Sequence, residues 1–211
     1  MGRQPTTAER ILEAARRRFN EKGYASTTLT EIAASVGISQ GNLTYHFPTK
    51  RDLVTRLQEE VAERIAERRV GDRPGKVEDD YVEHLSLAME LTARYLFLLR
   101  DDAQIEPGPD HQSPHRVLVD DYAALRGLLQ RIDRAGLFRK DMEVELDVLG
   151  RSLWVLSRYW MDYLSEMELC RDIGWEDQLR GIEHHLALLL PNLVAAGRRR
   201  FTRALEAHRS S

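Results

Sequence analysis

The chain has 211 residues, of which 42% are hydrophobic and 31% are charged, and its formal net charge is −3. This composition predicts a soluble globule with a hydrophobic core and argues against a nonspecific polycation. No apolar run reaches the roughly 20 residues of a membrane-spanning helix, and no apolar stretch follows the opening MGRQPTTAER, so neither a membrane partner nor a secretory signal is expected. The single cysteine, Cys170, excludes an intramolecular disulfide and is typical of a cytoplasmic protein.

Charge is distributed unevenly along the chain. Residues 1–52 carry eight Lys or Arg and five Asp or Glu, whereas residues 53–211 carry 23 and 29. A basic N-terminal segment followed by an acidic remainder indicates an anionic partner for the N-terminal segment.

The spacing of apolar residues predicts an all-α fold, because intervals of three and four dominate and the alternation typical of strands is absent. A capping box of Thr6 and Glu9 predicts a first helix, which should stop before Gly23. Thr28 and Glu31 form a second box, which predicts that the second helix starts there.

A third, short helix follows directly. Gly37 should end the second helix, and Ser39 can cap the third. The third helix must end near Phe47, because Pro48 disfavours helical geometry in the residue before it.

A long fourth helix is predicted from the capping pair Thr49 and Asp52 to about Val70, where the segment GDRPGK (71–76) interrupts the chain. We expect a small N-terminal domain, residues 1–50, and a larger helical domain, residues 51–211. Further helices are predicted at 77–100, 115–135, 142–166 and 176–206, the last kinked at Pro191, with a loop over most of 101–114.

The second and third helices, joined by a tight turn at Gly37, form a helix-turn-helix. Leu43 and Phe47 lie one turn apart and should face the core of the three helices. Amide side chains bond to base edges in the major groove, and hydroxyl and lysine side chains suit phosphate oxygens. The outer faces of the third helix therefore offer groups suited to DNA, on Gln40, Gly41, Asn42, Thr44 and Tyr45.

Three motifs at fixed spacing run through this region: ILEAA…F…KGY, T-x-x-E-I-A-x-x-x-G-[IV]-S and L-x-Y-H-F…K-x-x-L. In these motifs, residues 6–54 resemble the DNA-binding domain of the tetracycline-repressor (TetR) family of bacterial regulators. The rest of the chain resembles that family only in being helical and of the usual length.

The resemblance implies a role for individual residues. Positions on the recognition helix are Gln40, Gly41, Asn42 and Thr44. Positions that usually contact the phosphate backbone are Tyr45, His46, Lys50 and the helix cap Thr28, and Ser39 completes the predicted DNA-binding set. Many family members have a tyrosine where this chain has Thr44, so a phosphate contact at that position would be shorter or lost.

The resemblance also implies that the C-terminal helices bind a small effector and pair two subunits. Apolar stripes on the last two predicted helices suit a four-helix homodimer interface, although both could instead face their own core. The stripes are Leu146, Leu149, Leu153, Leu156, Trp160 and Leu164 on one helix and Leu179, Ile182, Leu186, Leu189 and Leu193 on the other.

An apolar effector pocket is harder to place from the sequence. Aromatic residues and methionines gather in residues 93–99 and 153–164, as they do in pockets and in cores alike. Taken singly, each of these residues fits a core better. The candidate ligand-binding set is Met89, Phe97, Tyr122, Trp154 and Tyr159.

Together these features predict a homodimeric transcriptional repressor, which a small, apolar effector releases from a near-palindromic double-stranded DNA operator. We recognise no nucleophile–base pattern, phosphate loop or paired-carboxylate motif, so no catalytic residue, metal or cofactor is expected. Two other classes stay open: a helical ligand-binding or scaffold protein that has lost DNA recognition, and an enzyme that acts on the apolar compound.

Overall fold

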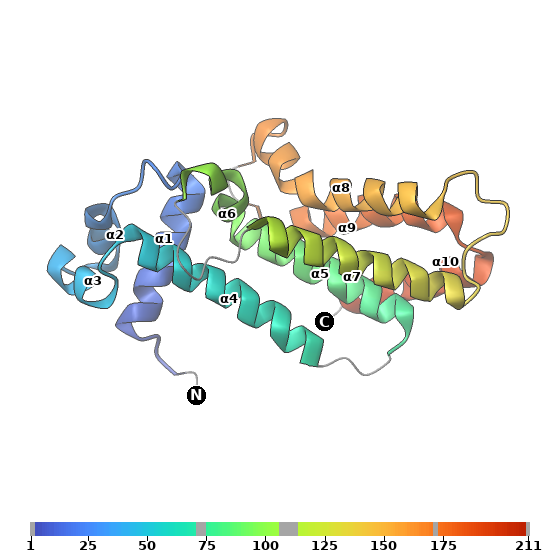
Figure 1. The fold of residues 1–211 in the computed structure, drawn as a ribbon, viewed down its shortest axis with the longest axis horizontal. Coiled ribbons are helices and arrows are strands. Elements are labelled where there is room, and N and C mark those ends of the chain that lie inside the picture. The colour runs from blue at the N-terminus through green and yellow to red at the C-terminus, as the bar shows by residue number, and fades with distance from the viewer. Residues whose placement is uncertain (1–2, 71–74, 106–113, 171–172, 210–211) are drawn as a thin grey trace. The chain divides into compact units, whose positions relative to one another are not determined.

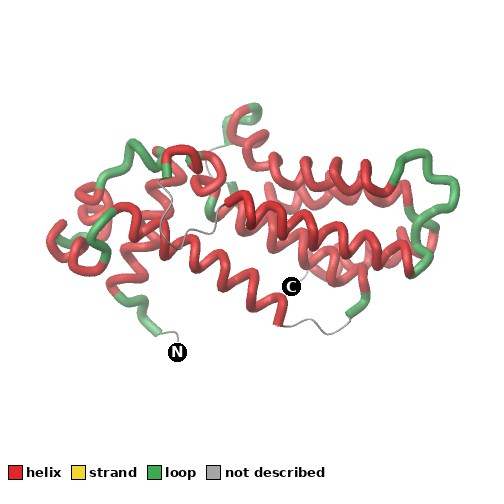
Figure 2. The backbone as a smooth tube through the Cα atoms, viewed as in Figure 1, coloured by secondary structure: helices red, strands yellow, loops and turns green. Residues whose placement is uncertain are grey.

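A computed structural model describes residues 3–70, 75–105, 114–170 and 173–209. Over these residues the chain is helical and forms no β-strand, so the predicted all-α class is confirmed (Figure 2). None of the helices described is long and apolar enough to cross a membrane. The chain folds into two compact units, an N-terminal unit (residues 1–71 and 94–114) and a C-terminal unit (residues 72–93 and 115–211).

The N-terminal unit takes its helices from two separate stretches of the chain (Figure 1). Both predicted capping boxes are present, Thr6 with Glu9 and Thr28 with Glu31, and Gly37 ends the second helix with a left-handed φ of 75°. The elements are α1 (Thr7–Lys22), α2 (Leu29–Val36), α3 (Gln40–His46), α4 (Lys50–Val70), α6 (Leu96–Arg100) and a 3-10 turn, η1 (Asp102–Gln104).

The core of the N-terminal unit is built on α1. Phe19 of α1 packs against Phe97 of α6 with ring centroids 5.0 Å apart, and both side chains are fully buried. Helices α1 to α4 complete this core with Ile11, Ala15, Ile32, Leu43, Leu53 and Leu57. The predicted inward position of Leu43 is therefore confirmed, whereas Phe47 is only half-buried.

The predicted helix 77–100 is broken at Tyr95, because side chains of α1 bind the main chain on both sides of the break. The amide nitrogen of Asn20 donates to the carbonyl of Arg94 (2.9 Å), and its oxygen accepts from the N–H of Phe97 (3.1 Å). Arg100 in turn donates to the carbonyl of Asn20 (3.0 Å), an end-of-helix acceptor of α1, and to the carbonyl of Phe19 (2.8 Å), which also accepts from the N–H of Gly23. Hence α6 is a separate helix, fastened to the end of α1.

The C-terminal unit also departs from prediction at its last helix, which is two helices rather than one kinked helix. Pro191 has no N–H to donate, and the chain makes a 3-10 turn there before Leu193 becomes extended. The extended residues pair with the loop after α7: Arg139 N donates to Asn192 O (2.9 Å). The elements are α5 (Val77–Arg94, whose last residue belongs to the N-terminal unit), α7 (Pro114–Arg134, whose first residue belongs to the N-terminal unit), α8 (Leu146–Glu166), α9 (Trp175–Leu189), η2 (Leu190–Asn192) and α10 (Ala195–Arg209).

Most of the two apolar stripes faces the core of the C-terminal unit itself. Fully or nearly buried positions are Leu149, Leu153, Trp160 and Leu164 on α8 and Ile182, Leu186, Leu189 and Leu193 after them. Close packing between these helices needs a glycine, since a Cβ at Gly181 would lie 2.6 Å from Cδ1 of Trp160. The two apolar stripes are thus explained by packing within one subunit. This was the alternative to a dimer interface formed by the stripes.

A polar group also lies inside the C-terminal unit. The ring of His185 is completely buried, with its Nε2 2.6 Å from the hydroxyl of Tyr81 and its Nδ1 2.7 Å from the hydroxyl of Ser157. Ser157 Oγ also lies 3.1 Å from the carbonyl oxygen of Leu153, so a neutral ring with its proton on Nδ1 lets Ser157 donate to Leu153 and Tyr81 donate to Nε2. Burial, followed by the charge of His84, lowers the pKa of His185 to about 3.

The predicted boundary at residue 50 is the first residue of α4, and α4 packs on α1 as part of the N-terminal unit. That residues 1–50 and 51–211 have separate functions stays a prediction. In the packing of the chain, the N-terminal unit extends to residue 71 and also includes residues 94–114.

Candidate nucleic-acid interface

The turn between α2 and α3 is held by main-chain hydrogen bonds and one cap. The N–H groups of Gly37 and Ile38 donate to the carbonyls of Ala34 and Ala33, each at 3.1 Å, which closes α2 in the way common at glycine-ended helices. Ser39 then caps α3, because its hydroxyl accepts from the N–H of Asn42 (3.1 Å). These bonds fix the direction in which α3 leaves the turn.

Helix α3 is anchored by one residue and exposes nearly all the others. Leu43 has no exposed surface, whereas Tyr45 keeps 84% of its surface exposed. The side chains of Gln40, Asn42 and His46 are exposed too, and Thr44 is half-buried. A short helix with one apolar anchor and a polar outer surface suits insertion into a groove of a polar partner.

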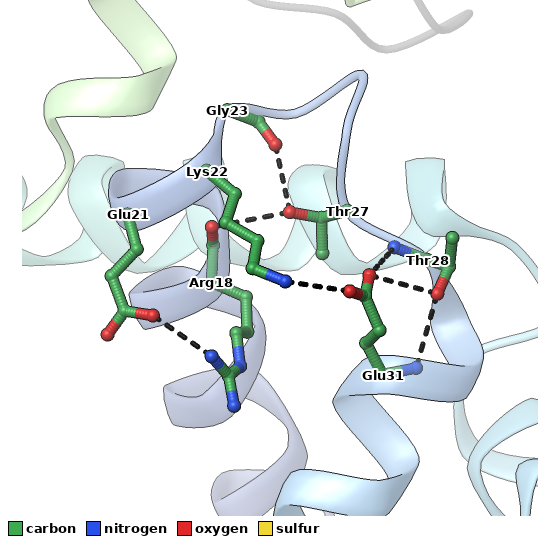
Figure 3. Close-up of polar contacts among 7 residues, drawn as sticks. All are labelled: Arg18, Glu21, Lys22, Gly23, Thr27, Thr28 and Glu31. Atoms are coloured by element: carbon green, nitrogen blue, oxygen red, sulfur yellow. Dashed lines mark hydrogen bonds and ion pairs between the residues drawn. The ribbon is translucent and has the colours of Figure 1, made fainter.

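The predicted contact residue Thr28 holds a cap at the start of α2 (Figure 3). Its hydroxyl accepts from Glu31 N (3.2 Å) and donates to the Glu31 carboxylate (3.1 Å), which also accepts from Lys22 Nζ (2.8 Å). The bond from Lys22, followed by those from the Thr28 backbone and hydroxyl, lowers the pKa of Glu31 to about 2. Thr28 is therefore engaged within the protein at both its donor and its acceptor.

Lys50 also has protein partners. Its Nζ donates to three carbonyl groups of the loop between α1 and α2, those of Tyr24 (2.7 Å), Thr27 (2.9 Å) and Ala25 (3.4 Å). The ammonium group lies 4.3 Å from the centre of the Tyr24 ring, and burial lowers the pKa of Lys50. With these partners Lys50 holds the loop that leads into α2.

Thr44 directs its hydroxyl toward its own helix. Oγ1 lies 3.1 Å from the carbonyl oxygens of both Gln40 and Gly41, to which it donates. A hydroxyl whose proton is bound in this way can accept a hydrogen bond but cannot donate one to a phosphate oxygen. That a phosphate contact at this position is shorter or lost stays a prediction.

One contact lies outside the residues that the sequence singled out. Thr30 Oγ1, in the first turn of α2, donates to Gln40 Oε1 at 2.7 Å. Nothing in the sequence pattern marks Thr30, because only the folded helix-turn-helix brings these two residues together.

The five candidate effector residues are divided between the two units, with Phe97 in the N-terminal unit and the other four in the C-terminal unit. Tyr122 and Trp154 meet edge to face with ring centroids 5.9 Å apart. Phe97 packs in the core of the N-terminal unit, Met89 is buried, and Tyr159 keeps 52% of its surface exposed. Only Tyr122 and Trp154 are therefore brought into direct contact as aromatic partners.

A carboxylate that the sequence analysis missed accompanies this aromatic pair. Asp121 accepts from the indole N–H of Trp154 (2.9 Å) and lies 3.6 Å from His84 Nε2. Within the described parts of the chain, no group of three or more His, Cys, Asp or Glu residues is arranged to hold a metal ion. Asp121 and His84 thus add polar character to one side of an otherwise aromatic contact.

The N-terminal unit defines a class of protein, since a capped helix-turn-helix with an exposed, polar second helix is a DNA-binding element. Residues 11–57 match the family described as bacterial regulatory proteins, tetR family, and residues 56–201 match the TetR family of bacterial transcriptional repressors. The chain belongs to the TetR family of transcriptional regulators.

Individual relatives agree with this assignment. The HTH-type transcriptional repressor AcnR of Corynebacterium diphtheriae is 31% identical over 144 residues, which cover 65% of this chain and 71% of AcnR. The HTH-type transcriptional regulator CymR of Pseudomonas putida is 26% identical over 167 residues, 79% of this chain and 69% of CymR. A crystal structure of a TetR-family regulator from Marinobacter aquaeolei VT8 matches with a TM-score of 0.75 at 26% identity, covering 96% of this chain and 98% of that one.

Proposed function

We propose that the protein is a homodimeric repressor whose two α3 helices enter successive major grooves on one face of a near-palindromic operator. In a simple one-turn arrangement the two half-sites lie about 34–36 Å apart. The observation that carries this proposal is the make-up of α3, where Leu43 is buried and the polar side chains around it are exposed. Tyr45, exposed to 84%, adds an aromatic ring with a hydroxyl group to this outer surface.

The exposed residues divide into two roles. Gln40 and Asn42 carry amides and read base edges, and Gly41 between them lets the helix approach closely. Tyr45 and His46, at the end of α3, contact phosphate oxygens. In this assignment Thr28 and Ser39 act as helix caps, Thr44 accepts hydrogen bonds, and Lys50 holds the loop before α2, as the bonds described above support.

A small, apolar effector binds the C-terminal unit in this proposal. Four of the five candidate residues lie in this unit, and the effector is assigned to three of them, Tyr122, Trp154 and Met89, with Asp121 as a polar neighbour. The effector can release the operator only by binding more tightly to a dimer whose two α3 helices are wrongly spaced.

The dimer forms through α8 and α9, by a face other than the buried stripes. The outer face of α8 exposes apolar and aromatic side chains at helical spacing, and α9 exposes two more. They are Val148, Val155, Tyr159 and Tyr163 on α8 and Trp175 and Leu188 on α9. Tyr159, predicted as an effector residue, is assigned to this face instead, because half of its surface is exposed.

Selection of binding sites from a random double-stranded DNA library tests the proposal. A palindrome with a fixed half-site spacing is the expected product, and binding should weaken steeply between 50 and 200 mM salt, because phosphate contacts release counterions. A folded, dimeric protein that enriches no sequence would favour the alternative of a ligand-binding or scaffold protein. Turnover of a bound apolar compound would favour an enzyme.

A further inference from the structure

The hydrogen bond between Thr30 and Gln40 joins the two helices of the helix-turn-helix through their side chains. Thr30 lies in the first turn of α2, and Gln40 is the first residue of α3. The Thr30 hydroxyl donates to Gln40 Oε1 at 2.7 Å, the usual length of an O–H···O hydrogen bond, and both residues are exposed. The bond therefore forms on the surface that the proposed function turns toward DNA.

This bond limits what the amide of Gln40 can offer to a base. A glutamine recognises adenine by presenting its oxygen and its nitrogen together, the oxygen to N6–H and the nitrogen to N7. While Oε1 accepts from Thr30, the oxygen is turned toward α2, and Nε2 with its two protons remains as the group to be presented. Guanine offers two acceptors, O6 and N7, which match a donor-only group.

The backbone of Gln40 is also held by hydrogen bonds. The orientation of its side-chain amide therefore depends on the bond to Thr30. The carbonyl of Gln40 accepts from Thr44 Oγ1 (3.1 Å), and the cap at Ser39 sets the start of α3. Because the main chain on both sides is held, loss of the Thr30 hydroxyl would free the amide without moving the helix.

We propose that Thr30 is a specificity-determining positioning residue, which orients Gln40 so that it reads guanine rather than adenine. The inference rests on the proposed function, because it requires α3 to lie in the major groove. Thr30 acts through Gln40 and is not itself assigned a base contact.

The test compares selected sites for the full-length protein and four variants. Gln40→Ala first identifies the base pair that Gln40 contacts, because the base preference should be lost at that one position of each half-site. In the unmodified protein that position should hold a G·C pair, favoured over A·T by about tenfold. Thr30→Val removes the hydroxyl but keeps the side-chain shape, and should shift the preference at this position to A·T, while Thr30→Ser should restore G·C.

Ser35→Ala is the matched control, because it removes another hydroxyl from α2, one that donates to the carbonyl of Ile32. It should leave the selected base unchanged. Circular dichroism shows whether Thr30→Val is folded, and Thr30→Ala replaces it if it is not. If Thr30 had only a structural role, Thr30→Val would weaken binding to all DNA sequences alike. Thr30→Ser would then not restore the base preference at one particular base pair.

Several results would overturn the inference. One is an A·T pair at the Gln40 position of the unmodified protein, and another is an unchanged base preference in the folded Thr30 variant. The inference would also be overturned if Gln40→Ala reduced the base preference at no position of the half-site. In that case a palindrome selected by the unmodified protein would still support the proposed function. Enrichment of no sequence by the unmodified protein would instead overturn the proposed function, and this inference with it.

Discussion

The Nζ of Lys50 lies 2.9 Å from the carbonyl oxygen of Thr27, the last residue before the cap of α2. Two more carbonyls of the same loop, those of Tyr24 and Ala25, share this ammonium group. The resemblance to the TetR family implies a phosphate contact for Lys50, whereas its protein partners point to a role in holding the loop. The two roles differ in stability and in salt dependence, so they can be separated.

We expect Lys50→Met to lower the free energy of unfolding by about 1–3 kcal/mol, because it removes the ammonium donor from the part-buried carbonyls of Tyr24 and Thr27 while keeping most of the aliphatic stem. Urea denaturation measures this change. Lys22→Met is the matched control: it removes an exposed ion pair with Glu31 and should cost less than about 1 kcal/mol. In DNA binding, the slope of affinity against salt should stay the same for Lys50→Met, and a slope smaller by about one would establish a phosphate contact instead.

Asn42→Ala should weaken operator binding by about 1–3 kcal/mol and relax the preference at one base pair of each half-site, because Asn42 is assigned to a base edge. Tyr45→Phe should weaken binding to all sequences alike, because the lost hydroxyl is assigned to phosphate. Titration of both variants against operator and unrelated duplexes makes the comparison. Equal behaviour on every DNA would contradict the division into base readers and phosphate contacts.

Gly181→Ala should lower the free energy of unfolding by about 1–3 kcal/mol, because the added methyl would overlap Trp160 and approach Met89 Cε to 3.0 Å. Gly127→Ala is the opposite case: it lies within α7, and a Cβ there would meet nothing within 4 Å. That change should stabilise the protein by about 0.5–1 kcal/mol through helix propensity. Thermal and urea unfolding of the pair check both signs, and a neutral Gly181→Ala would show that Trp160 can move aside.

Acid should destabilise the C-terminal unit through His185. Its folded pKa lies near 3, below the ordinary value of about 6.5, so the unfolded chain binds one more proton between these values. The stabilisation is complete above about pH 6.5 and is lost as the pH falls toward 3, by up to about 1.4 kcal/mol per pH unit. Urea unfolding at pH 7, 6 and 5 measures the slope, and His185→Gln should flatten it. An unchanged slope in that variant would mean that other groups cause the acid sensitivity.

Local chemistry made the helix starts predictable from the sequence. A capping box places both partners within four residues, so Thr6 and Thr28 could be identified as caps, and Gly37 as a helix end, without any knowledge of the fold. The buried position of Leu43 followed from helical periodicity in the same way.

Contacts between distant residues account for what the sequence did not reveal. The break at Tyr95 depends on Asn20, which is 74 residues away from Arg94 in the chain. The partners of Lys50 are 23 to 26 residues away, and Thr30 reaches Gln40 across ten. Periodicity also marks which side of α8 is buried, but it does not say whether the covering surface belongs to the same subunit or to another.

The fastening of α6 to α1 has a consequence for attempts to recombine family members. Arg100 binds the carbonyl of Phe19, and the buried carboxylate of Asp101 accepts from the N–H of Tyr24 (2.7 Å). A chimera joined near residue 57, where the match to the first family description ends, would transplant α1 without these two residues. The DNA-binding unit therefore consists of two separate segments of the chain. A chimera has to include residues 94–105 together with the N-terminal helices if the transplanted unit is to keep its stability.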